Sequence, residues 1–117
     1  MNQTEKLNRI FGALTDPSRR AILARLERAQ DGASVSDLAR PLTVKLPAVM
    51  KHLDILDDAG LITRTKSGRT VTVRLSSGSM HAAMAWLWRH ERFWSASLER
   101  LAAYAEANEA AARKDGK

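Results

Sequence analysis

Residues 45–60 read KLPAVMKHLDILDDAG, and this stretch combines the pattern of an amphipathic helix with an unusual order of charges. Apolar residues recur every three or four positions, and Gly60 stands where a helix C-cap is expected. Bases precede acids along the stretch, although the helix macrodipole favours the opposite order. We therefore expect the cations at the start of this helix to serve a partner outside the chain.

At about 100° per residue, the 45–60 helix divides into two faces. One side holds Leu46, Val49, Met50, Leu53, Leu56 and Asp57, and all of these except Asp57 are predicted to pack on the body of the domain. The predicted outer face holds Ala48, Lys51, His52 and Ile55, with Lys45 at the N-terminal flank. A recognition helix enters the major groove of DNA with its N-terminal end, so bases first and acids last fit a helix docked on DNA. The alternative is an ordinary solvated face.

Three shorter helical patterns precede this stretch. The first is predicted to start at a Thr4 cap, and the second at an Asp16 cap followed by Pro17. The third, a short one, opens at Ser34 or Ser36. A short helix, a tight turn and the 45–60 helix together predict a helix-turn-helix.

After Gly60 the hydrophobic period changes from 3.6 to 2, which predicts a strand over 61–65 and another over 70–76. Gly68 suits the turn between them. The segment 59–76 carries four bases and no acid, a charge of +4 within the chain's +6. A basic hairpin beside a helix-turn-helix is a wing, and it predicts nucleic-acid binding.

The predicted DNA contacts follow from these two elements. They are Lys45, Leu46, Ala48, Lys51 and His52 on the helix, and Arg64, Lys66, Ser67, Gly68 and Arg69 on the hairpin. Lys51 and His52 are assigned to base edges, since lysine can donate to guanine O6 and N7. Lys45 is assigned to phosphate. Arg64, Lys66 and Arg69 are assigned to phosphates or to the minor groove.

A helical pattern from about Met80 to about Glu109 is long for so small a domain. About 30 residues at 1.5 Å each give roughly 45 Å, against a radius of gyration near 13 Å for a compact chain of this size. We predict that its apolar stripe pairs with the first helix and with a second copy of the chain. The predicted dimer interface comprises Leu7, Ile10, Phe11 and Leu14 together with Leu87, Trp94, Leu98 and Leu101. Packing within one chain, or a small-molecule pocket lined by the three tryptophans, are the alternatives.

Composition bounds the remaining possibilities. The 117 residues predict one domain over 1–109 and a disordered tail over 110–117. A net charge of +6 and a pI near 10.3 favour an acidic partner. The chain has no cysteine, which excludes disulfides and thiolate metal sites and fits the cytoplasm. No signal peptide and no apolar run of roughly 18 residues is present, so we expect no membrane partner.

Three stretches, LTDPSRRAILARL (14–26), LPAVMKHLDILDDAGLI (46–62) and SGRTVTVRL (67–75), resemble the ArsR family of bacterial winged-helix transcriptional regulators. The stretch WLWRHERFWSASLERLAAYAE (86–106) is similar to the branch of that family with an aromatic-rich C-terminal helix. The resemblance spans roughly residues 4–106. It implies a mainly α winged helix-turn-helix of order α-α-α-α-β-β-α that forms a homodimer through its first and last helices. It also implies repression of transcription at a palindromic operator, often in the protein's own promoter.

The chain departs from the family pattern at informative positions. The third-helix motif that carries cysteines in metal-sensing members here reads VSDL (35–38), which offers no thiolate. His81 and His90 are nine residues apart and point to opposite faces of a straight helix, so they cannot chelate together within one chain. We therefore expect no metal and no other cofactor. Lys45 and Met50 stand where the family often has serine, which leaves the operator sequence open.

Several functional alternatives remain open. A winged-helix module could bind an acidic protein surface, and a metal-responsive repressor could hold a histidine and acid site across the dimer. The existence and identity of a small-molecule effector are also open. Enzymatic activity is not expected, because the sequence has no glycine-rich phosphate loop, no cysteine nucleophile and no paired zinc ligands.

Overall fold

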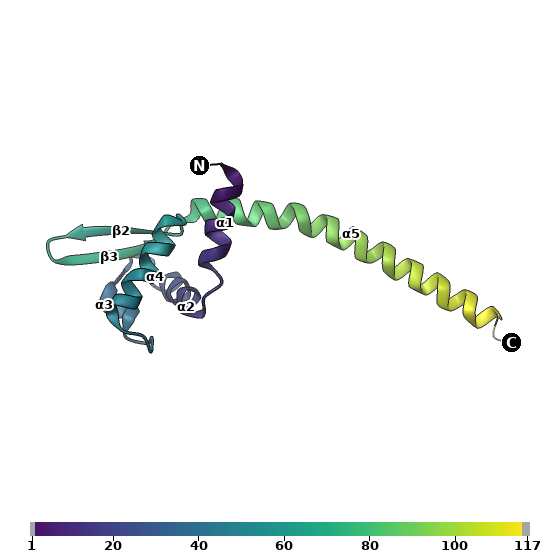
Figure 1. The fold of residues 1–117 in the computed structure, drawn as a ribbon, viewed down its shortest axis with the longest axis horizontal. Coiled ribbons are helices and arrows are strands. Elements are labelled where there is room, and N and C mark those ends of the chain that lie inside the picture. Colours follow the sequence, from purple (N-terminus) through teal and green to yellow (C-terminus); the bar gives the residue numbers. More distant parts are fainter. Residues whose placement is uncertain (1, 116–117) are drawn as a thin grey trace. The chain divides into compact units, whose positions relative to one another are not determined.

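The computed structural model describes residues 2–115, in eight elements (Figure 1). In chain order these are α1 (Gln3–Ala13), α2 (Pro17–Glu27), β1 (Ala33–Ser34), α3 (Val35–Ala39), α4 (Leu46–Asp58), β2 (Ile62–Ser67), β3 (Thr70–Leu75) and α5 (Ser77–Asp115). The fold is mainly helical with one small antiparallel sheet, and α3, the turn after it, α4 and the β2–β3 hairpin form a winged helix-turn-helix.

The chain divides into two compact units, one ending at Ala83 and one starting at Met84, so the boundary lies within α5. The hydrophobic core belongs to the first unit. Its buried members are Ile10, Ala13, Ile22, Leu23, Leu26, Ala33, Leu38, Val49, Leu53, Leu56, Ala59, Leu61, Ile62, Val73 and Ala83. Within residues 2–115, none of the buried core residues follows Ala83, and the single domain over 1–109 stays a prediction.

α4 is the central element of this core. It packs against α1, α2, α3 and β2, and its Val49, Leu53 and Leu56 are completely buried. Gly60 lies just past the end of the helix, as predicted, and follows the C-cap residue Ala59 with a φ of +73°, the left-handed conformation common at this position. Burial of three large side chains fixes which face of α4 is left for solvent.

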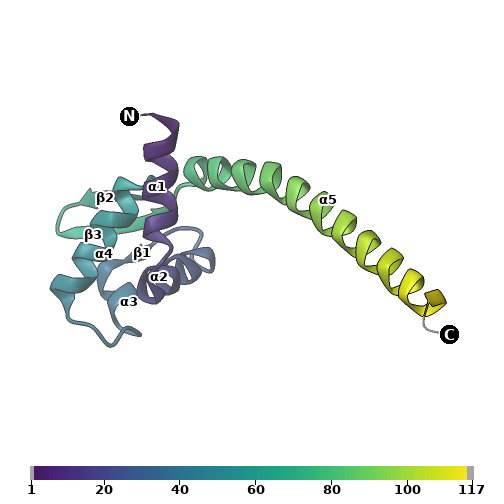
Figure 2. The same ribbon diagram turned by 45° about the vertical axis from the view of Figure 1, so that its right-hand side comes forward.

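The sheet has the order β1-β3-β2, and both pairs are antiparallel. β2 and β3 pair from Ile62 with Leu75 to Ser67 with Thr70, which leaves a two-residue turn whose first residue, Gly68, has a φ of +62°. The sequence did not predict β1, a strand of two residues that lies beside β3 (Figure 2). A strand this short gives no detectable alternation of apolar and polar residues.

Gly32 lets β1 approach β3. Its φ is +100°, and a Cβ atom built on it would lie 2.5 Å from Cγ2 of Thr72 and 3.0 Å from the carbonyl oxygen of Val73. Both the backbone conformation and the space therefore require glycine at this position.

Side-chain caps set the starts of the first three helices. Asn2, and not Thr4 as predicted, caps α1 by accepting a hydrogen bond of 2.8 Å from the Glu5 amide. Asp16 caps α2, as predicted, and accepts from the amides of Ser18 and Arg19. Desolvation raises the pKa of Asp16, but these two hydrogen bonds and the charges of His52 and Arg19 outweigh it, so the pKa lies below its ordinary value. Ser34 caps α3.

α5 is a single helix of 39 residues. It continues to Asp115, so the segment 110–115, part of the predicted disordered tail, is helical. Five of its six residues are alanine, arginine or lysine, which favour helix. Gly116 and Lys117, the remainder of the predicted tail, lie outside the described residues. None of the helices within residues 2–115 is both long enough and apolar enough to cross a membrane.

Candidate nucleic-acid interface

The exposed face of α4 is rotated from the predicted one. Leu46 and Met50, predicted to pack in the core, are 55% and 37% exposed, whereas Ile55, predicted to face outward, packs against the core. The prediction assumed one buried stripe, but α4 contacts three helices and a strand, which cover a wider arc. Ala48, a predicted DNA contact, is half-buried for the same reason.

The N-terminal end of α4 is basic and open. Lys45 occupies the N-cap position without a side-chain hydrogen bond to the helix, and both Lys45 and Lys51 are exposed. No acidic residue occurs between Asp37 and Asp54. Amide groups of the first turn of a helix lack partners within it, and they add a positive partial charge to that of the lysines. This end of α4 therefore suits an anionic partner.

His52 lies against α2 and does not point freely outward. Nη1 of Arg19 is 3.2 Å from Nδ1 of His52. The same guanidinium donates to the carbonyl oxygens of Ala13 at 2.7 Å and Gly12 at 3.2 Å. Because arginine can only donate, Nδ1 of His52 is the acceptor in this contact. Arg19 thus ties the C-terminal end of α1 and the middle of α4 to α2, an arrangement that the sequence did not indicate.

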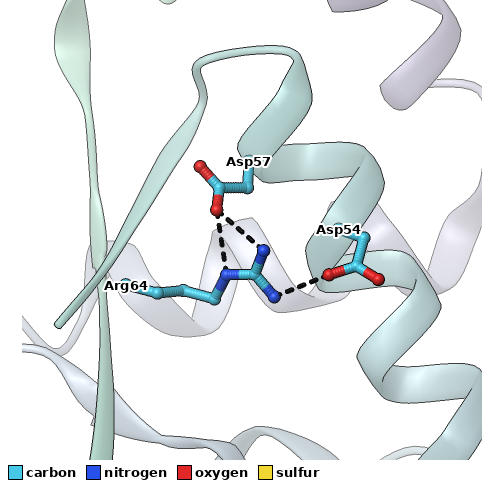
Figure 3. Close-up of polar contacts among 3 residues, drawn as sticks. All are labelled: Asp54, Asp57 and Arg64. Atoms are coloured by element: carbon cyan, nitrogen blue, oxygen red, sulfur yellow. Dashed lines mark hydrogen bonds and ion pairs between the residues drawn. The ribbon is translucent and has the colours of Figure 1, made fainter. Parts of the chain in front are cut away.

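The acids at the end of α4 hold an arginine of the hairpin (Figure 3). Nε and Nη2 of Arg64 lie 2.9 Å and 2.8 Å from Oδ2 of Asp57, and Nη1 lies 2.8 Å from Oδ1 of Asp54. The hydrogen bonds to Asp54 and Asp57 raise the pKa of Arg64. We call these three residues the Arg64 clasp. Arg64, predicted to contact phosphate, instead fastens β2 to α4, since its guanidinium is occupied by two carboxylates.

The tip of the wing, the β2–β3 hairpin, is exposed and basic. Lys66, Ser67, Gly68 and Arg69, all predicted DNA contacts, are exposed. The side chains of Lys66 and Arg69 make no hydrogen bond or ion pair with any residue in the described range 2–115. These two cations are therefore available to a partner, unlike Arg64.

The predicted dimer residues fall into two groups. In α1, Ile10 is buried in the core, so its assignment to a dimer interface is wrong: α1 uses this side chain to pack within its own unit. Leu7, Phe11 and Leu14 are half-buried beside the core. Four apolar residues of α5, which we call the α5 stripe, are 44% to 64% exposed: Leu87, Trp94, Leu98 and Leu101.

A metal ion is held in a protein by a cluster of ligand side chains. Within residues 2–115, no three side chains of histidine, cysteine, aspartate or glutamate come together as a metal site would need. The basic end of α4 and the tip of the wing are both exposed.

The chain is similar in sequence to known transcriptional regulators. A helix-turn-helix domain family matches residues 14–65. The chain is 36% identical over 91 residues to the HTH-type transcriptional regulator Rv2034 of Mycobacterium tuberculosis. The aligned region covers 78% of this chain and 80% of that protein. It is 27% identical to the transcriptional repressor SdpR of Bacillus subtilis, with 69% and 88% covered.

The chain is also similar to solved structures of transcriptional regulators. The crystal structure of the ArsR family transcriptional regulator RHA00566 is similar with a TM-score of 0.73 and 43% identity, over 79% of this chain and 93% of that one. An ArsR-like transcriptional regulator from Rhodococcus sp. RHA1 is similar with a TM-score of 0.70 and 32% identity, over 86% and 93%.

Proposed function

Because the chain belongs to the ArsR family of winged helix-turn-helix transcriptional regulators, we propose that it is a homodimeric repressor of a palindromic DNA operator. The observation that carries the proposal is the exposed N-terminal end of α4, where Lys45 and Lys51 stand in a segment without acids. A polyanion is the partner that matches this surface. The similar proteins are transcriptional regulators and not enzymes.

The proposed mode of binding uses α4 and the wing for different tasks. The N-terminal end of α4 enters the major groove, where Lys51 donates to a guanine edge and Lys45 contacts phosphate. Lys66 and Arg69 at the wing tip contact the sugar-phosphate backbone, which adds affinity and salt dependence without reading sequence. The Arg64 clasp holds the wing against α4, so that the two elements reach the duplex together.

The proposed dimer has two copies of this DNA-contacting surface. The α5 stripe of one copy packs against a second copy, which buries apolar side chains that one chain leaves exposed. Twofold symmetry then presents two α4 helices to half-sites about one turn of DNA apart. Occupation of such a site in a promoter represses transcription by blocking polymerase. Access to chromosomal DNA gives the proposed function a cytoplasmic location.

Footprinting on DNA upstream of the protein's own gene tests this function directly. We expect two protected half-sites whose centres are about 34–36 Å apart along the helix axis. Binding should weaken steeply as salt is raised. If no duplex is protected, or if binding does not depend on salt, the proposal fails and the winged-helix protein-interaction module becomes the better explanation.

Lys51→Ala and Arg69→Ala are expected to differ in kind. Loss of a base contact should weaken operator binding about 5-fold to 100-fold and leave binding to unrelated DNA nearly unchanged. Loss of a phosphate contact should weaken both equally and reduce the slope of log K against log salt by about 1. Fluorescence anisotropy at several salt concentrations measures all four quantities. Lys6→Ala on α1 is the control, and equal behaviour of Lys51→Ala and Arg69→Ala would contradict the division of tasks.

Arg64→Gln is expected to weaken operator binding about tenfold, because it leaves Asp54 and Asp57 as uncompensated negative charges on the helix that approaches the phosphates. The same substitution made in an Asp54→Asn, Asp57→Asn background should have almost no effect. A direct phosphate contact by Arg64 predicts the reverse, a loss that persists without the acids. A double-mutant cycle on operator affinity separates the two roles, with circular dichroism to verify the fold.

A further inference from the structure

Three apolar side chains are exposed in the first turns of α4 and just before the helix. Val44 is 36% exposed, Leu46 55% and Met50 37%, and we call them the apolar patch. Leu46 and Met50 are four residues apart and therefore lie on the same side of the helix. They stand beside Lys45 and Lys51, on the surface that the proposed function assigns to DNA. Apolar side chains gathered on an exposed surface commonly mark a contact site.

The surroundings of the apolar patch select its partner. The segment from residue 38 to residue 53 contains no acid, and its two lysines are both exposed. This charge is complementary to a polyanion. The major groove of DNA presents one apolar group among its hydrogen-bonding edges, the C5-methyl group of thymine. An apolar side chain in a basic recognition surface thus has a specific counterpart on the duplex.

We propose that Leu46 and Met50 read thymine methyl groups in each half-site of the operator. The inference rests on the proposed function and adds to it the bases that the site prefers. Four residues of helix span about 6 Å, so the two side chains contact different thymine methyl groups. Val44 precedes the helix and extends the apolar patch at its edge.

Deoxyuridine tests this contact atom by atom, because it differs from thymidine only in lacking the methyl group. The probe is the duplex protected in footprinting, with one thymidine at a time replaced by deoxyuridine. At one or two positions in each half-site, affinity of the full-length protein should fall about fourfold, the effect of removing one methyl-sized group from an apolar contact. Each such thymidine should be contacted by Leu46 or by Met50. In the alanine variant of the residue that contacts it, Leu46→Ala or Met50→Ala, replacing that thymidine by deoxyuridine should cause no further loss of affinity.

Met80→Ala is the matched control. Met80 is 38% exposed, almost equal to Met50, but it lies in α5 and outside the proposed DNA surface. This variant should keep both the wild-type affinity and the wild-type sensitivity to deoxyuridine. Because Leu46 and Met50 are exposed, their alanine variants should fold normally, which circular dichroism verifies.

The outcomes separate this inference from the function on which it rests. If deoxyuridine never weakens binding, or weakens the wild type and both variants equally, the side chains do not read the methyl groups and the inference is overturned. Unchanged operator affinity of Leu46→Ala and Met50→Ala also overturns it, and would give the apolar patch to a protein contact. If the wild-type protein prefers no DNA sequence, the proposed function itself fails and the inference with it.

Discussion

Leu98→Glu together with Leu101→Glu is expected to convert the proposed dimer into a monomer and to lower operator affinity about 10²-fold to 10⁴-fold. Both side chains belong to the α5 stripe and are 60% and 64% exposed in the single chain. Two like charges on each copy would have to be buried against each other, which costs more than the lost apolar contact. A monomer binds one half-site at a time and loses the effective concentration that linkage provides.

Sedimentation equilibrium and fluorescence anisotropy measure the two effects of this double substitution. Ala96→Glu together with Ala103→Glu is the control, since these exposed residues of α5 lie on the opposite face and add the same charge. The control variant should remain dimeric and should bind the operator. A wild-type protein that sediments as a monomer, or a Leu98→Glu, Leu101→Glu variant that stays dimeric, would refute the proposed interface.

Leu53→Ala is expected to lower the free energy of unfolding by about 2 to 5 kcal/mol, a large part of the 5 to 15 kcal/mol typical of a domain. Leu53 is completely buried in the middle of α4, where that helix packs against α1, α2, α3 and β2. Its truncation removes apolar contacts and leaves a cavity that helices on several sides cannot all close. Urea denaturation at fixed protein concentration measures the change, because dimerisation also contributes to stability.

Leu46→Ala is the matched control for stability. It makes the same chemical change seven residues earlier in the same helix, at a side chain that is 55% exposed. Its effect on the free energy of unfolding should stay within about 0.5 kcal/mol. A similar loss for both variants would mean that the buried face of α4 has been misplaced, and with it the surface proposed for DNA.

Local signals in the sequence predicted the course of the backbone well. Asp16 and Pro17 marked the start of α2, Gly60 the end of α4, and Gly68 the turn of the wing, and the structure confirms all three. Each of these signals acts through a residue's own backbone conformation or through hydrogen bonds within one turn. The fold class followed from their order along the chain.

Side-chain partners far apart in the sequence could not be predicted in this way. The Arg64 clasp joins residues seven and ten positions apart on different elements, and the hydrogen bond between Arg19 and His52 spans 33 positions. Ile10, predicted at a dimer interface, is buried in the core, and Met50, predicted in the core, is exposed. The reason is the same, because burial depends on which residues lie nearby in three dimensions. The DNA site stays a prediction, while two of its predicted residues, Arg64 and His52, make contacts within the protein.

The close approach of Gly32 to β3 predicts which related proteins keep strand β1. A Cβ atom at that position would lie 2.5 Å from Cγ2 of Thr72 and 3.0 Å from the carbonyl oxygen of Val73, so the present approach of the chain to β3 requires glycine there. The residue aligned with Gly32 is thus a marker by which relatives that retain the short edge strand can be sorted from those that have lost it. A solved relative with a bulky residue there and an intact strand would show that the marker does not hold.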